Sequence, residues 1–320
     1  MRNLNLFLFL FIIIGCNRNN TSSETLDPGL HEDQSISINS EDREYHLYIP
    51  PNATGAPIVF LFHGNKSSNS ELIGLTNAQA PYSVWLDLAE ENDIILAIPN
   101  GTTGSTNDRG WNDCRMDAVS NPSSDDVLFV SELIDFLVNT YDADEKRVYA
   151  LGTSNGGHFS IRLAEEIPEK ITAFGAIAAS SAKNSVCSNS STPVSAIFIN
   201  GTFDPILPYE GGEMPSNRGE VESTDFTIEY WNDRNETDQV PETFSFPDID
   251  TEDDCTAERF LYKNGSNGTE VALYMVKEGG HTEPSIEERY GNLFLLIVGN
   301  QNGDFEMAEE VWSFFETKSK

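Results

Sequence analysis

Residues 148–157 read VYALGTSNGG and change from an apolar run to a glycine-rich turn. Beyond them, apolar residues recur at four-residue spacing over Phe159–Ile167 and end before a proline, which predicts a helix. A serine held at such a turn takes a strained backbone conformation, and glycine two positions to either side prevents a collision with the neighbouring chain. The pattern therefore predicts a strand, a sharp turn and a helix, with Ser154 projecting from the turn as in a nucleophile elbow.

Other apolar runs have the length and composition of strands that are buried on both faces of a sheet. These runs are Ile58–Phe62, Ile94–Ile98, Ala173–Ala178, Val194–Ile199 and Val271–Val276. Helical patterns separate several of them, and polar and apolar residues alternate over 35–39 and 43–49, which favours an antiparallel pair at a sheet edge. The sequence predicts one α/β domain over residues 34–320, with helices on both faces of a mostly parallel sheet.

The segment from about residue 209 to 258 interrupts this alternation. It is acidic, has few aliphatic runs and contains three prolines. We expect an irregular, lid-like insertion beside the site rather than a second domain. Within it, Asp248–Asp254 lacks the mid-loop glycine of an EF-hand, so we expect a solvated acidic loop and no metal site.

The first residues of the chain predict export. Leu6–Ile14 is apolar throughout but has only about half of the ~20 residues that a membrane-spanning helix needs. The stretch IIGC that ends at Cys16 resembles a bacterial lipobox, which implies cleavage before this cysteine and acylation of its sulfur. We expect residues 1–15 to be a signal peptide, 16–33 to be a tether, and the mature protein to be a lipoprotein of the outer membrane or cell surface.

Charge and cysteine content limit the partners. The chain has 52 acidic and 19 basic residues and a net charge of -33, which disfavours nucleic acid and anionic lipid headgroups. Membrane contact is therefore expected only through the lipid on Cys16. In an oxidising compartment, Cys114, Cys187 and Cys255 allow one disulfide and one free thiol, but the sequence leaves the pairing and the oligomeric state open.

A nucleophilic serine needs a base, and the base needs an acid that orients it. His281 follows the last predicted strand in a glycine-rich loop, GGHTEP, where it can reach across the carboxyl edge of the sheet. Asp204 follows the strand Val194–Ile199 at the same edge, whereas Asp225 and Asp233 lie in the irregular segment and are weaker candidates. The order serine, acid, histidine is the one expected for a nucleophile elbow of this kind.

Negative charge that develops on the substrate needs backbone N–H donors. Asn155, at the start of the predicted helix, supplies one, and the turn after an early strand supplies the other from Gly64 or Asn65. His63 in the same turn is expected to brace the loop rather than to act as a base. Trp111 follows another strand, and either forms a wall of the substrate pocket or is packed in the core.

With these residues in place, the chain resembles the secreted polyhydroxybutyrate depolymerase-like group of α/β-hydrolases, which includes feruloyl and acetylxylan esterases. The resemblance covers most of residues 45–320. It rests on LFHGN (61–65), RGWNDC (109–114), DDVLFV (125–130), RVYALGTSNGGHFS (147–160), NGTFDPILPYEGG (200–212) and TEVALYMVKEGGHTEP (269–284). The resemblance implies an α/β-hydrolase fold, a triad of Ser154, Asp204 and His281, and no cofactor.

The sequence thus predicts an exported serine hydrolase of carboxylic esters, with feruloyl or acetyl esters of polysaccharides as the expected substrates. The alternative substrate is a polyhydroxyalkanoate such as polyhydroxybutyrate. An alternative of another class is a non-catalytic surface lipoprotein that binds a polymer. The presence of serine, aspartate and histidine candidates in the right order favours the enzyme.

Overall fold

The computed structural model describes residues 25–76, 78–188 and 190–320. The predicted signal peptide, Cys16 and the first part of the predicted tether lie outside these residues. Within the described ranges, no helix combines the length and the apolar character needed to cross a bilayer.

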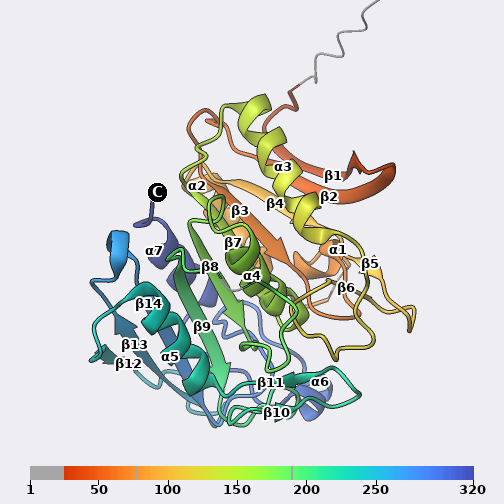
Figure 1. Ribbon diagram of the computed structural model, residues 1–320. Coiled ribbons are helices and arrows are strands. Elements are labelled where there is room, and N and C mark those ends of the chain that lie inside the picture. The colour runs from red at the N-terminus through yellow and green to blue at the C-terminus, as the bar shows by residue number, and fades with distance from the viewer. Residues whose placement is uncertain (1–24, 77, 189) are drawn as a thin grey trace, which may run out of the picture.

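Ten strands form one twisted sheet in the order β1-β2-β4-β3-β7-β8-β9-β14-β13-β12 (Figure 1). They are β1 (Gly29–Ile38), β2 (Glu41–Ile49), β3 (Ile58–Phe62), β4 (Ile95–Pro99), β7 (Val148–Thr153), β8 (Ala173–Ile177), β9 (Ser195–Gly201), β12 (Glu242–Ser245), β13 (Thr256–Tyr262) and β14 (Val271–Lys277). The strands from β4 to β14 in this order are parallel, and antiparallel strands flank them at both edges. The expected mostly parallel sheet is confirmed. Short strands form two ribbons outside it: β5 (Thr102–Thr103) with β6 (Arg109–Gly110), and β10 (Gly212–Glu213) with β11 (Glu220–Val221).

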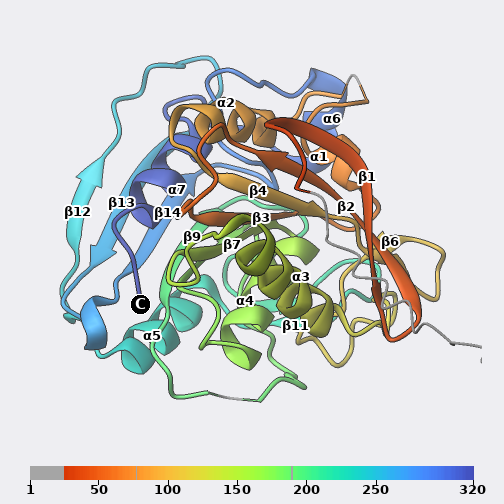
Figure 2. The same ribbon diagram turned by 90° about the horizontal axis from the view of Figure 1, so that it is seen from above.

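Helices cover both faces of this sheet. They are α1 (Asn69–Leu72), α2 (Val84–Glu91), α3 (Asp126–Tyr141), α4 (Asn155–Glu166), α5 (Thr224–Asn235), α6 (Asn292–Val298) and α7 (Met307–Phe315), with 3₁₀ turns at Pro81–Ser83 and Ser266–Gly268. Figure 2 shows α3, α4 and α5 on one face and α2 and α7 on the other. Two separate apolar clusters fill these layers, and burial of the strands between them explains their uninterrupted apolar sequences.

Two expected boundaries differ from the structure. β1 begins at Gly29, so residues 29–33, including His31, belong to the sheet and not to a tether. The segment 209–258 is more regular than expected, since it contains α5, strands β10 to β12 and the start of β13. Trp231 of α5 is buried, and it packs against Phe174 of β8 with the ring centroids 4.6 Å apart. This packing fixes α5 against the sheet.

One disulfide links the loop after β6 to the loop after β8. It joins Cys114 to Cys187, with the Cα atoms 5.2 Å apart. Cys255 is a free, buried thiol. The expectation of one disulfide and one free thiol is therefore confirmed, and the pairing that the sequence left open is assigned.

Candidate active site

Ser154 lies at the junction of β7 and α4 with φ 56° and ψ -120°, in a region that side chains rarely occupy. The turn depends on the flanking glycines. A Cβ atom on Gly152 would lie 2.4 Å from the backbone of Gly156, and one on Gly156 would lie 2.3 Å from the carbonyl oxygen of Phe62. Because no other residue fits at these two positions, the sequence spacing and the strained serine have one common cause.

Asp204 and His281 meet at the carboxyl edge of the sheet, where the loops after β9 and β14 run side by side. The Nδ1 atom of His281 lies 2.7 Å from Oδ2 of Asp204. The other carboxylate oxygen accepts the backbone N–H groups of Ile206 and Leu207 at 2.7 and 2.8 Å. With Nδ1–H donated to a fixed carboxylate, the Nε2 atom of His281 is left as the acceptor.

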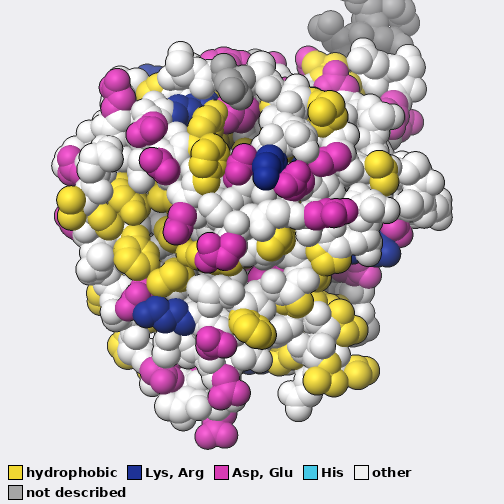
Figure 3. Space-filling model, turned by 60° about the horizontal axis from the view of Figure 1, so that its bottom comes forward, with side chains coloured by type: hydrophobic (Ala, Val, Ile, Leu, Met, Phe, Trp, Pro, Cys, Tyr) yellow, Lys and Arg dark blue, Asp and Glu magenta, His cyan; other side chains and the backbone are white. Residues whose placement is uncertain are grey.

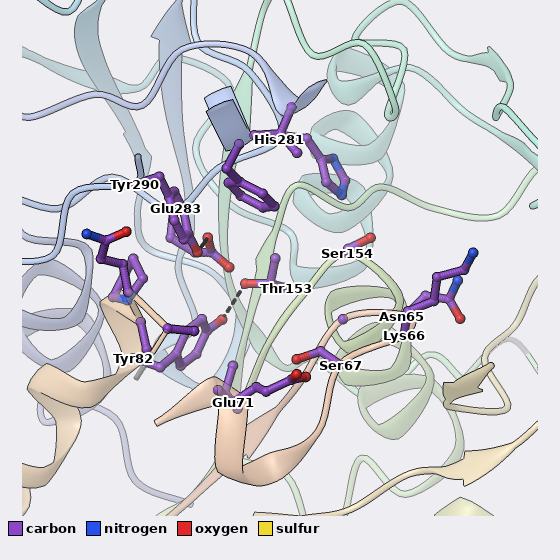
Figure 4. A pocket seen from close by; sticks show the side chains of 18 of the residues that line it. Asn65, Lys66, Ser67, Glu71, Tyr82, Thr153, Ser154, His281, Glu283 and Tyr290 are labelled. Atoms are coloured by element: carbon purple, nitrogen blue, oxygen red, sulfur yellow. Dashed lines mark hydrogen bonds between the residues drawn. The ribbon is translucent and has the colours of Figure 1, made fainter. Parts of the chain in front are cut away.

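A cavity of about 640 Å³ opens beside the elbow, and Ser154 and His281 both line it. Figure 4 shows the ring of His281 and the hydroxyl of Ser154 next to each other at its wall. Among the described residues, no hydrogen bond joins this hydroxyl to the ring. In enzymes without substrate, such bonds are often long and tighten when substrate binds.

The residues expected to supply backbone N–H donors to an oxyanion lie near Ser154. Asn155 is the first residue of α4, so its N–H lies at the positive end of a twelve-residue helix. Gly64, in the loop after β3, lies close to Ser154: a Cβ atom on it would be only 3.6 Å from the Cβ of the serine. Both Gly64 and Asn65 line the cavity. The three residues expected to supply N–H groups to an oxyanion are thus gathered around Ser154.

Two histidines near the elbow are buried and do not face the cavity. The Nδ1 atom of His63 donates to the carbonyl of Gly64 at 2.8 Å, and its Nε2 accepts the N–H of Gly101 at 3.0 Å. His158, on α4, bonds to the carbonyl of Ser180 at 2.8 Å. Burial lowers the pKa of His63 to about 4 and that of His158 to about 3, so both rings are neutral at pH 7. His63 braces the loop, as expected.

These two rings predict acid sensitivity of the fold. An exposed histidine in the unfolded chain has a pKa near ~6.5, so below this pH the unfolded state binds protons that the folded state does not. The free energy of unfolding should therefore decrease as the pH falls from about 6.5 to 4, by about 1.4 kcal/mol per pH unit for each histidine. Urea unfolding at several pH values measures this slope. His158→Gln should reduce this slope by about 1.4 kcal/mol per pH unit, because one histidine fewer binds a proton on unfolding. An unchanged slope would contradict the conclusion that the buried ring of His158 is neutral.

Trp111 does not form a wall of the cavity, so the proposed substrate-binding role is wrong and the alternative, packing in the core, holds. It is 0% exposed, stacks on Phe159 with the ring centroids 5.1 Å apart, and packs edge-on against Phe62. Its indole N–H donates to the carbonyl of His63 at 2.9 Å. A large aromatic ring gains more from this apolar cluster than from a solvated cleft, and Trp111 instead supports the loop before Gly64.

The opposite wall of the cavity carries polar groups that the sequence patterns did not single out. Glu283 accepts a hydrogen bond from the hydroxyl of Tyr290 at 2.6 Å, and the hydroxyl of Tyr82 is 2.8 Å from that of Thr153 (Figure 4). Glu283 lies two residues after His281, and this short separation is the one sequence feature that could have identified it as a residue of the site. Nothing in the sequence connects Tyr82 with the loop after β14.

Among the charged side chains on the face at which the parallel strands end, acidic ones outnumber basic ones (Figure 3). Figure 3 shows them scattered over this face, with few lysines or arginines. Within the expected lid segment, only Arg218 lines the cavity. The cavity is therefore bordered mainly by residues 64–72, 78–82 and 281–298, and residues 209–258 contribute little to it.

The family model described as "Putative esterase" matches residues 36–227. A bifunctional acetylxylan esterase/xylanase of Neocallimastix patriciarum is 28% identical over 169 residues, which are 52% of this chain and 22% of that protein. A probable feruloyl esterase C of Aspergillus flavus is 26% identical over 197 residues, which are 61% of this chain and 64% of that protein. The matched region is less than two thirds of the length of each of these relatives.

The solved structure of an acetyl xylan esterase from Aspergillus awamori is similar in fold. The TM-score is 0.54 at 13% sequence identity, and the match covers 90% of this chain and 99% of the other. At this identity the likeness concerns the fold alone, and it confirms the expected α/β-hydrolase architecture.

Proposed function

Because the chain belongs to this esterase family, we propose that it is a serine hydrolase of carboxylic esters in which Ser154, His281 and Asp204 act as nucleophile, base and orienting acid. One observation carries the proposal: a strained serine at an elbow shares a cavity with a histidine whose Nδ1 is bonded to a buried carboxylate. This arrangement leaves Nε2 available to take a proton from the serine hydroxyl.

In the proposed reaction, the Oγ of Ser154 attacks the ester carbonyl while Nε2 of His281 takes its proton. The N–H groups of Asn155 and of Gly64 or Asn65 stabilise the oxyanion of the tetrahedral intermediate. His281 then gives the proton to the leaving alcohol, and an acyl-enzyme remains. Water, deprotonated by the same ring, attacks the acyl group and releases the acid and the free serine.

Feruloyl or acetyl esters carried by polysaccharides are the proposed substrates. Support comes from the names of the two relatives above and from the predicted export, in which residues 1–15 are removed and Cys16 is acylated. An enzyme anchored at the cell surface would meet esters on extracellular polymers. On this proposal, the catalytic domain consists of residues 34–320 together with residues 29–33, which form the first part of β1.

A polyhydroxyalkanoate is the second candidate, and α6 favours it. Leu293 and Leu296 of this short helix are 79% and 83% exposed, while Phe294 and Val298 line the cavity. Exposed apolar side chains beside a catalytic cavity suit contact with a water-insoluble, uncharged polymer. The observation says nothing of cleavage, so it ranks below the first candidate.

A substrate panel tests the proposed function. We expect the purified protein to hydrolyse short p-nitrophenyl esters, and to turn over methyl ferulate or acetylated xylan in preference to hydroxybutyrate oligomers. Initial rates at matched concentrations measure kcat/KM for each. Turnover confined to the oligomers would replace the polysaccharide proposal by the polyester one, and no turnover of any ester would contradict the esterase proposal.

A further inference from the structure

Glu283 is a buried carboxylate inside the cavity that the proposed reaction does not use. The residue is 6% exposed, and its Oε2 atom accepts the hydrogen bond from Tyr290. Among the described residues, no lysine, arginine or histidine forms an ion pair with it, and Oε1 accepts no hydrogen bond. Because Oε1 has no donor within the described part of the chain and is open to the cavity, it is able to accept a hydrogen bond from a ligand there.

The neighbouring groups are neutral hydroxyls. Burial and the nearby Glu283 raise the pKa of Tyr82 and of Tyr290 well above the usual value for tyrosine, so both phenols keep their protons. The Tyr82 hydroxyl is bonded to that of Thr153, which directly precedes Ser154. Figure 4 shows the carboxylate directed toward Thr153 and Tyr82 within the cavity. The result is a carboxylate acceptor with hydroxyls beside it, while Lys66 and Arg218, which also line the cavity, form no ion pair with it in the part of the chain that the structure describes.

The backbone holds Glu283 in this place. Pro284 follows Glu283 directly, and the backbone carbonyl of Glu283 accepts a hydrogen bond from the side chain of Gln301 at 2.8 Å. His281 is two residues earlier in the same loop, and its backbone N–H donates to the carbonyl of Val298 at 2.6 Å, so hydrogen bonds hold the backbone of both residues. A preorganised acceptor of this kind discriminates between ligands that have and lack a matching donor.

We propose that Glu283 forms a subsite for a hydroxyl group on the acyl part of the ester, which selects hydroxylated acyl groups and rejects anionic ones. This inference rests on the proposed esterase function and, of the two proposed substrates, favours feruloyl over acetyl esters, because an acetyl group has no hydroxyl. A cavity of about 640 Å³ is of the size that holds small molecules, whereas the polymer that carries the ester must stay outside, so the acyl group occupies the cavity. A hydroxyl both donates to Glu283 and accepts from a neighbouring hydroxyl, which an ammonium group does not do.

Four methyl esters that differ at one position test the subsite: methyl cinnamate and its 4-hydroxy, 4-carboxy and 4-aminomethyl derivatives. In the wild type, kcat/KM for the hydroxy ester should exceed that for cinnamate at least tenfold, and the carboxy ester should be the poorest. Glu283→Leu should bring the hydroxy-to-cinnamate ratio close to one. Glu283→Gln keeps an uncharged acceptor, so it should retain part of the ratio and raise kcat/KM for the carboxy ester at least tenfold.

Glu287→Gln is the matched control, because it removes an equal charge from an exposed position four residues away. It should keep the wild-type ratios. Labelling of Ser154 by a fluorophosphonate normalises every rate to the amount of folded, active protein. Equal rates for the hydroxy ester and cinnamate in an active wild type would overturn the subsite alone, as would a preference for the aminomethyl ester. Failure to hydrolyse any ester would overturn the proposed function as well.

Discussion

Replacing Ser154 by alanine is expected to lower kcat for every ester on the order of 10⁶-fold and to abolish labelling by a fluorophosphonate. The substitution removes only the Oγ atom, which is the proposed nucleophile. The remaining N–H donors and the cavity can still bind an ester, so a small residual rate and a nearly unchanged KM should remain. Steady-state kinetics and mass spectrometry of the labelled protein measure both effects.

The control for this variant is its stability. Alanine has the same Cβ as serine, so the strained backbone at φ 56° is neither relieved nor worsened, and the melting temperature should change little. Ser160→Ala, on α4, removes a buried hydroxyl that bonds to the carbonyl of Gly156 and should leave labelling intact. Folded wild-type protein that no fluorophosphonate labels would favour the non-catalytic polymer-binding lipoprotein.

Local chemistry explains why so much of the fold was predictable. Strands with helices on both sides must be apolar on both faces, so β3, β7 and β14 are readable as short uninterrupted runs. The elbow is readable because Gly152 and Gly156 are required by close contacts between backbones. The meeting of Asp204 and His281 follows from topology, since residues after parallel strands gather at one edge.

Long-range packing explains what could not be read. Trp111 follows a strand and precedes polar residues, as a pocket residue would, and only the positions of Phe62 and Phe159 place it in the core. The segment 209–258 has few aliphatic residues, but a few aromatic contacts such as that of Trp231 suffice to order α5. Such contacts depend on partners far apart in the chain and leave no periodic signal.

The composition of the cavity wall could not be predicted from the sequence either. Tyr82 comes from the turn before α2 and Glu283 from the loop after β14, some two hundred residues later in the chain. Their common position beside Thr153 results from the strand order, in which the chain reverses direction across the sheet around β3 and β7. The sequence therefore predicts the proposed reacting groups better than the groups that would select the substrate. The reacting groups come directly after strands, whereas the positions of the others depend on long-range packing.

Asp204→Asn is expected to lower kcat about 10⁴-fold while the protein remains folded. Asparagine can still accept the N–H groups of Ile206 and Leu207 through its oxygen, but its NH₂ group then faces Nδ1 of His281 and donates to it. This bond forces the ring proton onto Nε2, which then cannot accept the proton of Ser154. The rate of fluorophosphonate labelling should fall in parallel with kcat, with little change in KM or melting temperature. Asp225→Asn, at the exposed start of α5, is the matched control and should keep full activity. Full activity of the Asp204 variant, or loss of activity in the Asp225 variant alone, would refute this assignment of the acid.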